Sequence, residues 1–307
     1  MSQTLHLKAY AKVNLGLDVI RRREDGYHEV RMIMQTVRLF DRLSLTKNQS
    51  GQITLSVNLP YLPVNEKNLV YRAIDIIRKN YHISEGIHAD INKRIPVAAG
   101  MAGGSSDAAA AFVGMNQMFD LGISQETLME YAVGLGADIP YCIMRGTALS
   151  EGIGEKLTPL PPMPDCWFLI VKPVFSMSTR FVYENLRLDE STCHPDIDGM
   201  VAALKNQDLT GITDRMGNVL EQVTQEHFPQ IREIKDCMRQ EGALNALMSG
   251  SGSTVFSIFT SRKAAEAAGR VCRDRFQIKQ TAVVCPFNKP HVRSRILSRP
   301  NRGEQQK

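Results

Sequence analysis

Apolar and polar residues alternate at the start of the chain. Between residues 4 and 20 the apolar side chains fall on every second position: Ala9, Ala11, Val13, Leu15, Leu17 and Val19. Because side chains alternate between the two faces of a strand, this segment is predicted to be a strand with one buried face and with Lys12 and Asn14 on the other. Similar apolar runs predict strands at residues 30–45, 53–57, 87–91, 167–171, 255–259 and 281–285.

Helical spacing appears first at residues 68–81, where Leu69, Ala73, Ile74, Ile77 and Tyr81 form one apolar stripe. A second helix is expected to follow a glycine-rich segment that starts at residue 96, and to continue to residue 119. Ser124 and Ser261 are suited to capping the N-termini of two further helices. Helices are also predicted at residues 200–205 and 218–241.

A cluster of prolines interrupts these patterns in the middle of the chain, at positions 159, 161, 162 and 164. Such a cluster predicts a boundary between an N-terminal domain (1–162) and a C-terminal domain (163–285), followed by a short tail (286–307). Strands and helices are interspersed without a regular strand–helix–strand repeat. The pattern therefore predicts an α+β fold rather than a doubly wound parallel sheet.

Composition and charge exclude several classes of protein. The 307 residues are 43% apolar and 22% charged, which is typical of a globular protein. The net charge of +5 lies wholly in residues 286–307, which carry six Lys or Arg and one Glu. The rest of the chain is balanced, so nucleic acid is not an expected partner, and the basic tail is expected to be a flexible, solvated terminus.

No apolar stretch reaches the roughly 18–20 residues that would cross a bilayer, so no membrane partner is expected. The N-terminus has neither the basic nor the apolar region of a signal peptide, which predicts a cytoplasmic location. The six cysteines include no CxxC pair, so they are interpreted as reduced thiols rather than ligands of a zinc ribbon.

Residues 96–111 read PVAAGMAGGSSDAAAA, a glycine-rich loop that runs directly into a helix. Glycines let the backbone approach an anion closely, and the first N–H groups of a helix attract phosphate. The segment is neither a P-loop nor a GxGxxG fingerprint. The alternative is a tight packing turn in which Ser106 or Asp107 caps the helix. A second Gly-Ser loop at residues 249–254 is a weaker phosphate candidate, because such loops are common linkers.

Other polar residues have ordinary interpretations beside the functional ones. Lys12 and Asn14 share one strand face, which is equally suited to solvent. Asp138 lies in a Gly-Ala-Asp-Ile-Pro turn, which suits either a positioned carboxylate or a simple Asx-turn. His28 lies in a polar loop, where a single histidine is usually just exposed.

Four segments together resemble the GHMP family of small-molecule kinases: AYAKVNLGLDV (9–19), the loop at 96–111, GADIPYC (136–142) and MSGSGST (248–254). The resemblance implies the α+β, two-domain GHMP kinase fold, with an N-terminal ribosomal-protein-S5-domain-2-like domain and a C-terminal ferredoxin-like α/β domain. ATP and an alcohol substrate then meet in the cleft between the domains. The segment DGYHEV (25–30) resembles members whose substrate is a cytidine diphosphate derivative of methylerythritol.

The resemblance also implies roles for individual residues. Lys12 and Asp138 match the family's catalytic pair, Asp138 as general base. The residues implied to bind ATP, with Mg²⁺ as its companion, are Pro96, Val97, Ala98, Ala99, Gly100, Met101, Ala102, Gly103, Gly104, Ser105 and Ser106. Met101 stands where the family often has leucine, a near-isosteric change. The residues implied to bind the substrate are Asn14, Tyr27, His28, Thr179 and Tyr183.

Three points stay open at this stage. Phe181 competes with Tyr183 as the second aromatic ring against the cytosine. Ser105, Ser106 and Asp107 are all near enough to be Mg²⁺ ligands, and spacing selects none. The alternatives to this activity are another GHMP kinase, acting on homoserine, mevalonate or a sugar, a non-catalytic ligand sensor on the same fold, and a nucleic-acid binder that depends on the tail alone.

Overall fold

A computed structural model of the chain describes residues 4–190 and 192–288. The strands are β1 (Thr4–Arg22), β2 (His28–Asn48), β3 (Ile53–Val57), β4 (Gly86–Asn92), β5 (Thr147–Gly152), β6 (Lys156–Pro159), β7 (Trp167–Lys172), β8 (Gly217–Asn218), β9 (Asn245–Met248), β10 (Val255–Phe259) and β11 (Gln280–Val284). The helices are α1 (Leu69–Asn80), α2 (Gly103–Met118), α3 (Gln125–Val133), α4 (Asp138–Met144), α5 (Thr179–Glu184), α6 (Ile197–Lys205), α7 (Leu209–Asp214), α8 (Glu221–His227), α9 (Gln230–Gln240) and α10 (Arg262–Phe276).

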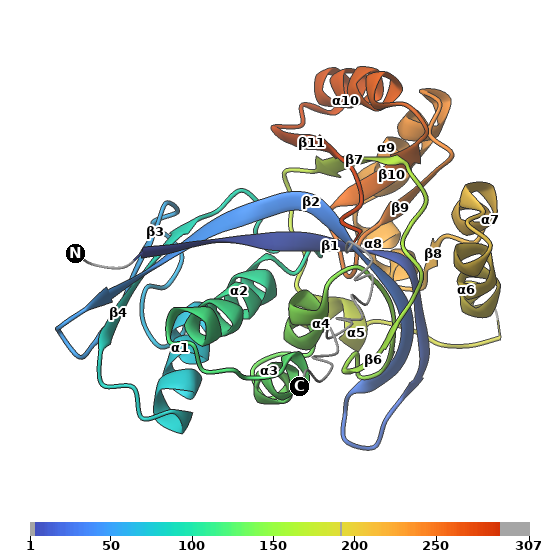
Figure 1. Ribbon diagram of the computed structural model, residues 1–307. Coiled ribbons are helices and arrows are strands. Elements are labelled where there is room, and N and C mark those ends of the chain that lie inside the picture. The colour runs from blue at the N-terminus through green and yellow to red at the C-terminus, as the bar shows by residue number, and fades with distance from the viewer. Residues whose placement is uncertain (1–3, 191, 289–307) are drawn as a thin grey trace, which may run out of the picture.

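The first sheet is built on a long antiparallel ribbon of β1 and β2 that crosses the molecule (Figure 1). Its strand order is β3-β4-β2-β1-β8. β5 pairs with the first part of β2, β4 pairs with the last part, and β6 pairs with β5. Helices α1 to α4 gather on one side of this ribbon (Figure 1). The sheet therefore forms a platform for α2 and α4, and β1 runs beneath these two helices.

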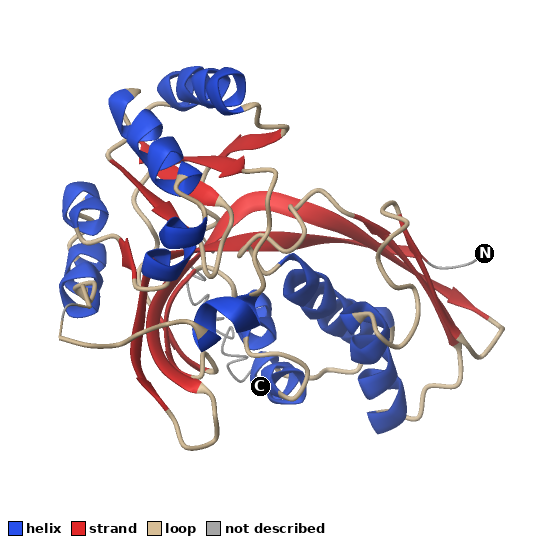
Figure 2. Cartoon of the chain, turned by 180° about the vertical axis from the view of Figure 1, so that it is seen from behind, coloured by secondary structure: helices blue, strands red, loops and turns tan. Residues whose placement is uncertain are grey.

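The second sheet is antiparallel, with the order β11-β7-β10-β9. In chain order this is 4-1-3-2, and helices α9 and α10 lie against it (Figure 2). Two helix-bearing sheets with mostly antiparallel pairing confirm the predicted α+β fold. β8, which pairs in parallel with β1, comes from the later half of the chain but extends the first sheet.

Strand β1 differs from the prediction of one buried and one polar face. Its register against β2 shifts between Tyr10 and Lys12 and again between Asn14 and Gly16. The first shift leaves two extra residues on β2 and the second leaves one extra residue on β1, and such irregularities bend the ribbon and re-aim its side chains. Residues 11, 13 and 15 therefore pack in a core with the second sheet, while 9, 17 and 19 pack in the core that contains α2. Residues 11–19 are buried throughout, so the polar residues among them are enclosed as well.

The helix ends follow the sequence closely where a capping side chain is present. Asn68, Ser124 and Ser261 each accept a hydrogen bond from a backbone N–H in the first turn of α1, α3 and α10. The single helix predicted at residues 218–241 is wrong. Pro229 separates α8 from α9, because the residue before a proline, Phe228, cannot take helical backbone angles easily.

The beginning of the basic tail is attached to β2. Pro286 forms a bridge with Val37, and the N–H of Phe287 donates to the carbonyl of Thr36 at 2.8 Å. Residues 289–307, which hold most of the tail, lie outside the described residues. The domain boundary near residue 162 stays a prediction. Among the described residues, no helix has the length and apolar character needed to span a membrane.

Candidate active site

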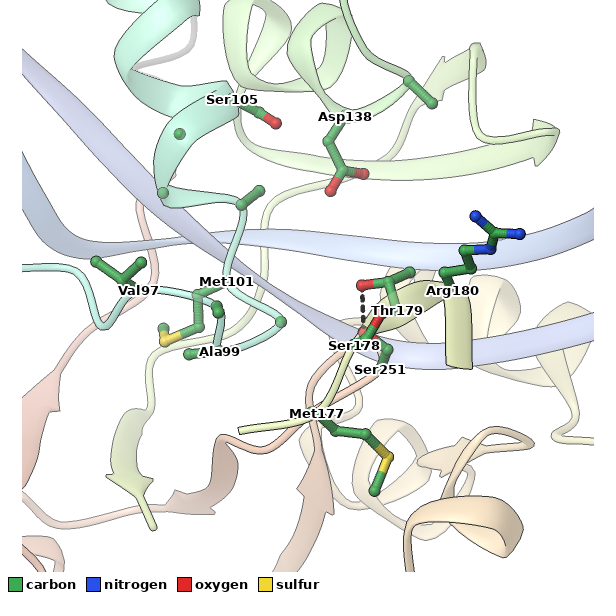
Figure 3. A pocket seen from close by; sticks show the side chains of 18 of the residues that line it. Val97, Ala99, Met101, Ser105, Asp138, Met177, Ser178, Thr179, Arg180 and Ser251 are labelled. Atoms are coloured by element: carbon green, nitrogen blue, oxygen red, sulfur yellow. Dashed lines mark hydrogen bonds between the residues drawn. The ribbon is translucent and has the colours of Figure 1, made fainter. Parts of the chain in front are cut away.

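A cavity of about 1160 Å³ lies where the glycine-rich loop, the β1–β2 hairpin, α4, α5 and the second Gly-Ser loop come together. Its wall includes residues from both halves of the chain, such as Lys12, Asp138, Thr179 and Ser251. Figure 3 shows Ser105 and Asp138 on one side of the cavity, with Thr179 and Ser251 across from them. A concave site of this size is enough for a nucleotide and a second small molecule.

The N-terminus of α2 opens into the cavity without a capping side chain. The N-cap residue is Ala102, and no side chain bonds the first N–H groups of the helix. Gly103, Gly104 and Ser105 line the cavity at this point. The packing-turn alternative, in which Ser106 or Asp107 caps the helix, is wrong. Uncapped N–H groups and the positive end of the helix dipole favour an anion here.

The glycine-rich loop is held by two neighbours. The N–H of Lys12 donates to the carbonyl of Met101 at 3.2 Å, which ties the loop to β1. The hydroxyl of Ser249 donates to the carbonyl of Gly100 at 2.8 Å, which ties it to the second Gly-Ser loop. Gly100 has a φ of +73°, and a Cβ placed there would lie 2.0 Å from the carbonyl oxygen of Ser249. Only glycine fits this contact between the two loops.

Lys12 and Asp138 meet at the edge of the cavity. Asp138 is the first residue of α4 rather than part of a free turn, and its side chain is 34% exposed. The Lys12 Nζ atom lies 3.6 Å from the Asp138 Oδ2 atom and donates to the Oδ1 atom of Asn14 at 2.8 Å. Lys12 is only 5% exposed, so its charge acts on the carboxylate and the cavity with little screening.

Two of the predicted site residues stand behind the cavity wall. Asn14 is fully buried between Lys12 and the sulfur of Met32, so it orients the ammonium group and does not line the cavity. Ser106 is 2% exposed, and its hydroxyl donates to the carbonyl of Tyr10 at 2.7 Å. The remaining predicted residues, 96–105 together with Lys12, Tyr27, His28, Asp138, Thr179 and Tyr183, all line the cavity.

Aromatic rings gather at the end of the cavity near the β1–β2 turn. The rings of His28 and Tyr183 are 5.0 Å apart, and Tyr27 beside them is 61% exposed. Phe181 does not line the cavity and packs edge-on against His227 instead. Burial, together with the charge of Arg22, lowers the pKa of His28, so its ring is neutral near pH 7 and can both donate and accept a hydrogen bond.

The sequence did not reveal another part of the wall. The segment between β3 and α1 contributes Leu62, Pro63, Lys67 and Asn68, and Ile91 of β4 lies with it. The only signal was an irregular, proline-containing stretch between a strand and a helix. Arg180 of α5 also lines the cavity, although its long side chain is mostly exposed and pairs with Glu184.

A buried charge cluster lies beside α2. Lys93 donates to both Asp41 and Asp107, and the distance to Asp107 is 2.6 Å. Asp41 is fully buried, and the Oδ1 atom of Asp107 is buried without a hydrogen-bond partner. Burial raises the pKa of Asp107 to about 8, and the charge of Asp41 acts in the same direction. Asp107 therefore keeps a proton near neutral pH.

This shift makes stability depend on pH. Between 3.8, the ordinary value, and about 8, folded Asp107 holds a proton that the unfolded chain has lost. The contribution of this group to stability therefore falls as pH rises through that window. Asp107→Asn keeps the neutral form at every pH. We expect its melting temperature, relative to the unsubstituted protein, to rise steadily from pH 5 to pH 8 in thermal unfolding, and a constant difference would contradict the assignment.

The described residues contain no ready-made metal cage. Among residues 4–190 and 192–288, no three His, Cys, Asp or Glu side chains come together as potential ligands. The Ser106 hydroxyl bonds the Tyr10 carbonyl, and Asp107, which also lines the cavity, accepts from Lys93 through its Oδ2 atom. Ser105 is therefore the best-placed candidate of the three, with its hydroxyl facing the cavity (Figure 3). Such a site suits Mg²⁺, which usually keeps several waters and is held largely by substrate phosphates.

Comparisons with known proteins agree with this geometry. The family model described as GHMP kinases N terminal domain matches residues 68–146, and the one described as GHMP kinases C terminal matches residues 200–278. A protein of Lachnoclostridium phytofermentans named 4-diphosphocytidyl-2-C-methyl-D-erythritol kinase is 58% identical over 264 residues. The match covers 86% of this chain and 91% of that protein.

Two solved structures are also similar. A crystal structure of 4-(cytidine 5'-diphospho)-2C-methyl-D-erythritol kinase has a TM-score of 0.79 and 31% identity, and the match covers 92% of this chain and all of that one. Homoserine kinase from Cytophaga hutchinsonii has a TM-score of 0.78 at 21% identity, over 93% of this chain and 95% of its own. At that identity the second likeness supports the fold alone.

Proposed function

The chain belongs to the GHMP kinase family and, within it, to the 4-diphosphocytidyl-2-C-methyl-D-erythritol kinases, and we propose that it transfers the γ-phosphate of ATP to the 2-hydroxyl of that substrate. The products are the 2-phosphate and ADP. The reaction belongs to the non-mevalonate (methylerythritol phosphate) pathway to isoprenoid precursors. A cytoplasmic location is part of the same proposal.

The observation that carries the proposal is the place where Lys12 and Asp138 meet. Their charged groups are 3.6 Å apart at the wall of the cavity. The uncapped N-terminus of α2 and the aromatic residues Tyr27, His28 and Tyr183 line the same cavity. An alcohol bound beside the pair can therefore face a phosphate on the helix and extend a base toward the aromatic end.

The chemistry follows from this placement. Asp138 accepts the proton of the 2-hydroxyl as its oxygen attacks the γ-phosphorus of ATP. The new P–O bond forms as the bond to the β-phosphate oxygen breaks and ADP leaves. Lys12 orients the Asp138 carboxylate, lowers the pKa of the attacking hydroxyl and stabilises the negative charge on the transferred group. Asn14 keeps the Lys12 ammonium in place by accepting its hydrogen bond at 2.8 Å.

ATP binding is assigned to the glycine-rich loop and the start of α2. Residues 96–105 and the first N–H groups of α2 take the phosphates, and Ser106 supports the loop from behind through its bond to the Tyr10 carbonyl. The nucleoside fits the wall made by Leu62, Pro63 and Asn68. The hydroxyl of Ser105, which lines the cavity, is assigned to hold Mg²⁺ together with the phosphates. When bound, the metal neutralises charge on the phosphate oxygens.

The cytidine end of the substrate is assigned to Tyr27, His28 and Tyr183. The cytosine ring stacks against Tyr27 and Tyr183, and the neutral His28 ring hydrogen-bonds its edge. Thr179, whose hydroxyl is 2.7 Å from that of Ser251, closes the substrate side of the cavity. Phe181 is not given the stacking role, because it packs against His227 away from the cavity.

Tyr27→Ala tests the cytosine assignment. Loss of one stacking ring is expected to raise KM for the cytidyl substrate about tenfold or more, since such stacking contributes about 1–3 kcal/mol. KM for ATP stays unchanged, because Tyr27 is at the other end of the cavity from the phosphate loop. Phe181 is an exposed aromatic residue outside the cavity, so Phe181→Leu is the matched control. It is expected to leave KM for the cytidyl substrate and KM for ATP unchanged. Steady-state kinetics that show equal losses for both substrates after Tyr27→Ala would refute the assignment.

A coupled ADP-release assay decides among the candidate activities. ATP and Mg²⁺ are supplied with the cytidyl substrate, with homoserine or with mevalonate. Turnover with the cytidyl substrate alone is expected, because kinases whose substrates lack cytosine have no need of the Tyr27–His28 pair. Turnover with homoserine or mevalonate supports another GHMP kinase, and no turnover with any of them supports a ligand sensor. Retention of Lys12 and Asp138 argues against the sensor.

A further inference from the structure

A buried charged pair lies outside the cavity, in the later half of the chain. Glu221 of α8 and Lys235 of α9 are 9% and 8% exposed, and their side chains form an ion pair. Burying two charges costs free energy that a pair recovers only when its other hydrogen bonds are satisfied. The Glu221 carboxylate meets this condition, since it also accepts from Gln225 at 3.0 Å and from a backbone N–H.

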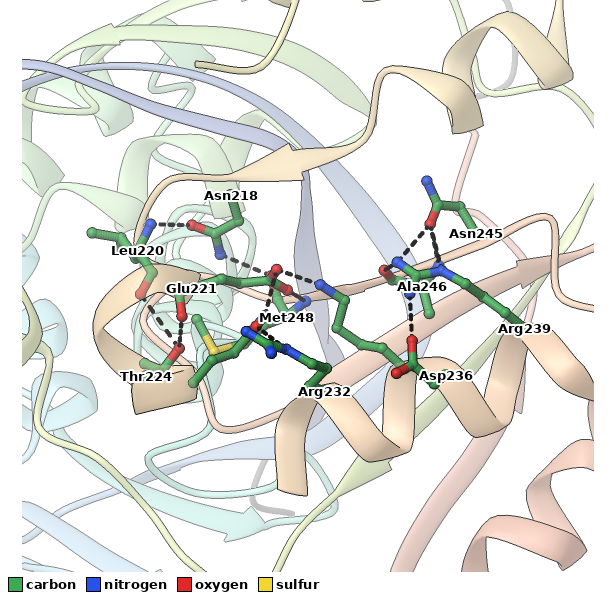
Figure 4. Close-up of polar contacts among 12 residues, drawn as sticks. Asn218, Leu220, Glu221, Thr224, Arg232, Asp236, Arg239, Asn245, Ala246 and Met248 are labelled. Carbon is green, nitrogen blue, oxygen red and sulfur yellow. Dashed lines mark hydrogen bonds and ion pairs between the residues drawn. The ribbon is translucent and has the colours of Figure 1, made fainter. Parts of the chain in front are cut away.

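That backbone N–H belongs to Met248, the last residue of β9. It donates to the Oε1 atom of Glu221 at 2.7 Å. The Nδ2 group of Asn218 donates to the carbonyls of Met248 at 2.9 Å and of Gly250 at 2.8 Å. Figure 4 shows Asn218 and Glu221 at this end of β9, with Arg239 at the other end. These two side chains thus hold the backbone at Met248 and Gly250, where the chain leaves β9.

The segment held in this way is the second Gly-Ser loop. Gly250, Ser251 and Gly252 line the cavity. Ser249 bonds the carbonyl of Gly100, and the N–H of Thr254 donates to the carbonyl of Ala99 at 3.4 Å. A shift of this loop is therefore passed directly to the glycine-rich loop, against which it packs at backbone distance.

Asn218 is anchored to the first sheet as well. It forms β8, which pairs with β1 at Leu17, and its Oδ1 atom accepts from the N–H of Leu220 at 3.0 Å. Asn218 therefore connects the second Gly-Ser loop to β1, the strand that carries Lys12. The strand of the catalytic lysine is thus linked to the loop that packs against the glycine-rich loop.

We propose that Asn218 and Glu221 are positioning residues that hold the second Gly-Ser loop against the glycine-rich loop, so that the ATP phosphates lie in register with Lys12 and Asp138. Lys235 balances the charge of Glu221. The inference rests on the proposed kinase function. Its specific claim is that these residues act on ATP binding and turnover through the loop, beyond any contribution to stability.

Asn218→Ala tests the claim most directly. It removes the Nδ2 group and with it the two hydrogen bonds to the carbonyls of Met248 and Gly250, each worth about 1 kcal/mol, so KM for ATP is expected to rise about tenfold and kcat to fall. KM for the cytidyl substrate is expected to change less than KM for ATP, because Tyr27, His28 and Tyr183 are untouched and the loop reaches the substrate side only through the bond of Ser251 to Thr179. Arg239→Ala is the matched control: Arg239 holds the opposite end of β9 through Asn245 and the Ala246 carbonyl, at 3.2 Å each. It is expected to lower the melting temperature without changing KM for ATP.

A pair of double variants separates the two roles of Glu221, the hydrogen-bond acceptor for the Met248 N–H and the charged partner of Lys235. E221Q/K235M keeps an oxygen for the Met248 N–H without leaving a buried lysine unpaired, and its KM for ATP is expected to remain close to that of the unsubstituted protein. E221A/K235M lacks that oxygen and is expected to behave like Asn218→Ala. Thermal unfolding of each variant establishes that it is folded at the assay temperature.

Binding of a non-hydrolysable ATP analogue, measured by calorimetry, separates this inference from the proposed function. If Asn218→Ala binds the analogue about tenfold more weakly than the unsubstituted protein, the loop role is supported whatever alcohol the enzyme uses. If folded Asn218→Ala and E221A/K235M bind it with unchanged affinity and keep KM for ATP, the residues are structural and the inference is wrong. Failure of the unsubstituted protein to phosphorylate the cytidyl substrate refutes the activity instead.

Discussion

Asp138→Ala is expected to lower kcat by about 100-fold or more, because the reacting hydroxyl loses the group that accepts its proton. KM for both substrates is expected to change little. Asp138 is the first residue of α4 and contacts Lys12 at the cavity wall, while the aromatic residues and the loop at 96–105 remain in place. A loss confined to kcat marks an interaction made in the transition state rather than one that binds the ground state.

Asp138→Asn sharpens this prediction. The amide keeps the shape of the side chain and its contact with Lys12 but cannot take a proton, so its kcat is expected to be as low as that of the alanine variant. Binding of an ATP analogue and thermal unfolding serve as controls for the integrity of the site. If either variant keeps more than about a tenth of the original turnover, Asp138 is not the general base.

Local signals in the sequence predicted most of the fold. Asn68, Ser124 and Ser261 begin helices because each side chain can accept a hydrogen bond from the first turn. The strand 255–259 coincides with β10. The two register shifts between β1 and β2 escaped prediction, since a register shift depends on the partner strand and leaves no mark on the alternation of apolar residues.

The site was predictable where function imposes an unusual local sequence. The glycine-rich loop stands out because its backbone must pass close to other backbone, as at Gly100 against Ser249. Asn218, Glu221 and Lys235 carry no such signal. Their partners are far away in the chain or are backbone groups, so only the folded arrangement reveals that they hold one loop.

Lys12→Ala is expected to lower kcat about 1000-fold, more than most single substitutions in the cavity. Lys12 is the buried cation nearest the carboxylate of Asp138, and it acts where solvent screens little charge. Loss of one preorganised electrostatic contact in such a site costs about 3–4 kcal/mol of transition-state stabilisation. The N–H of residue 12 still donates to Met101, so the glycine-rich loop keeps its tie to β1 and KM for ATP is expected to rise only modestly.

Chemical rescue distinguishes a missing charge from a damaged fold. Truncation at residue 12 leaves a space beside Asn14 and Asp138 that a small primary ammonium ion can occupy. Adding ethylammonium or propylammonium is expected to restore part of the lost kcat in a saturable manner, whereas a neutral alcohol of the same size restores none. Because Asn14 is fully buried and still presents its Oδ1 atom, the added ion finds the same acceptor that Lys12 had. A variant that keeps a tenth or more of its turnover without any added amine would show that the ammonium group does not stabilise the transferred phosphoryl group, and Asp138 would then have to act alone.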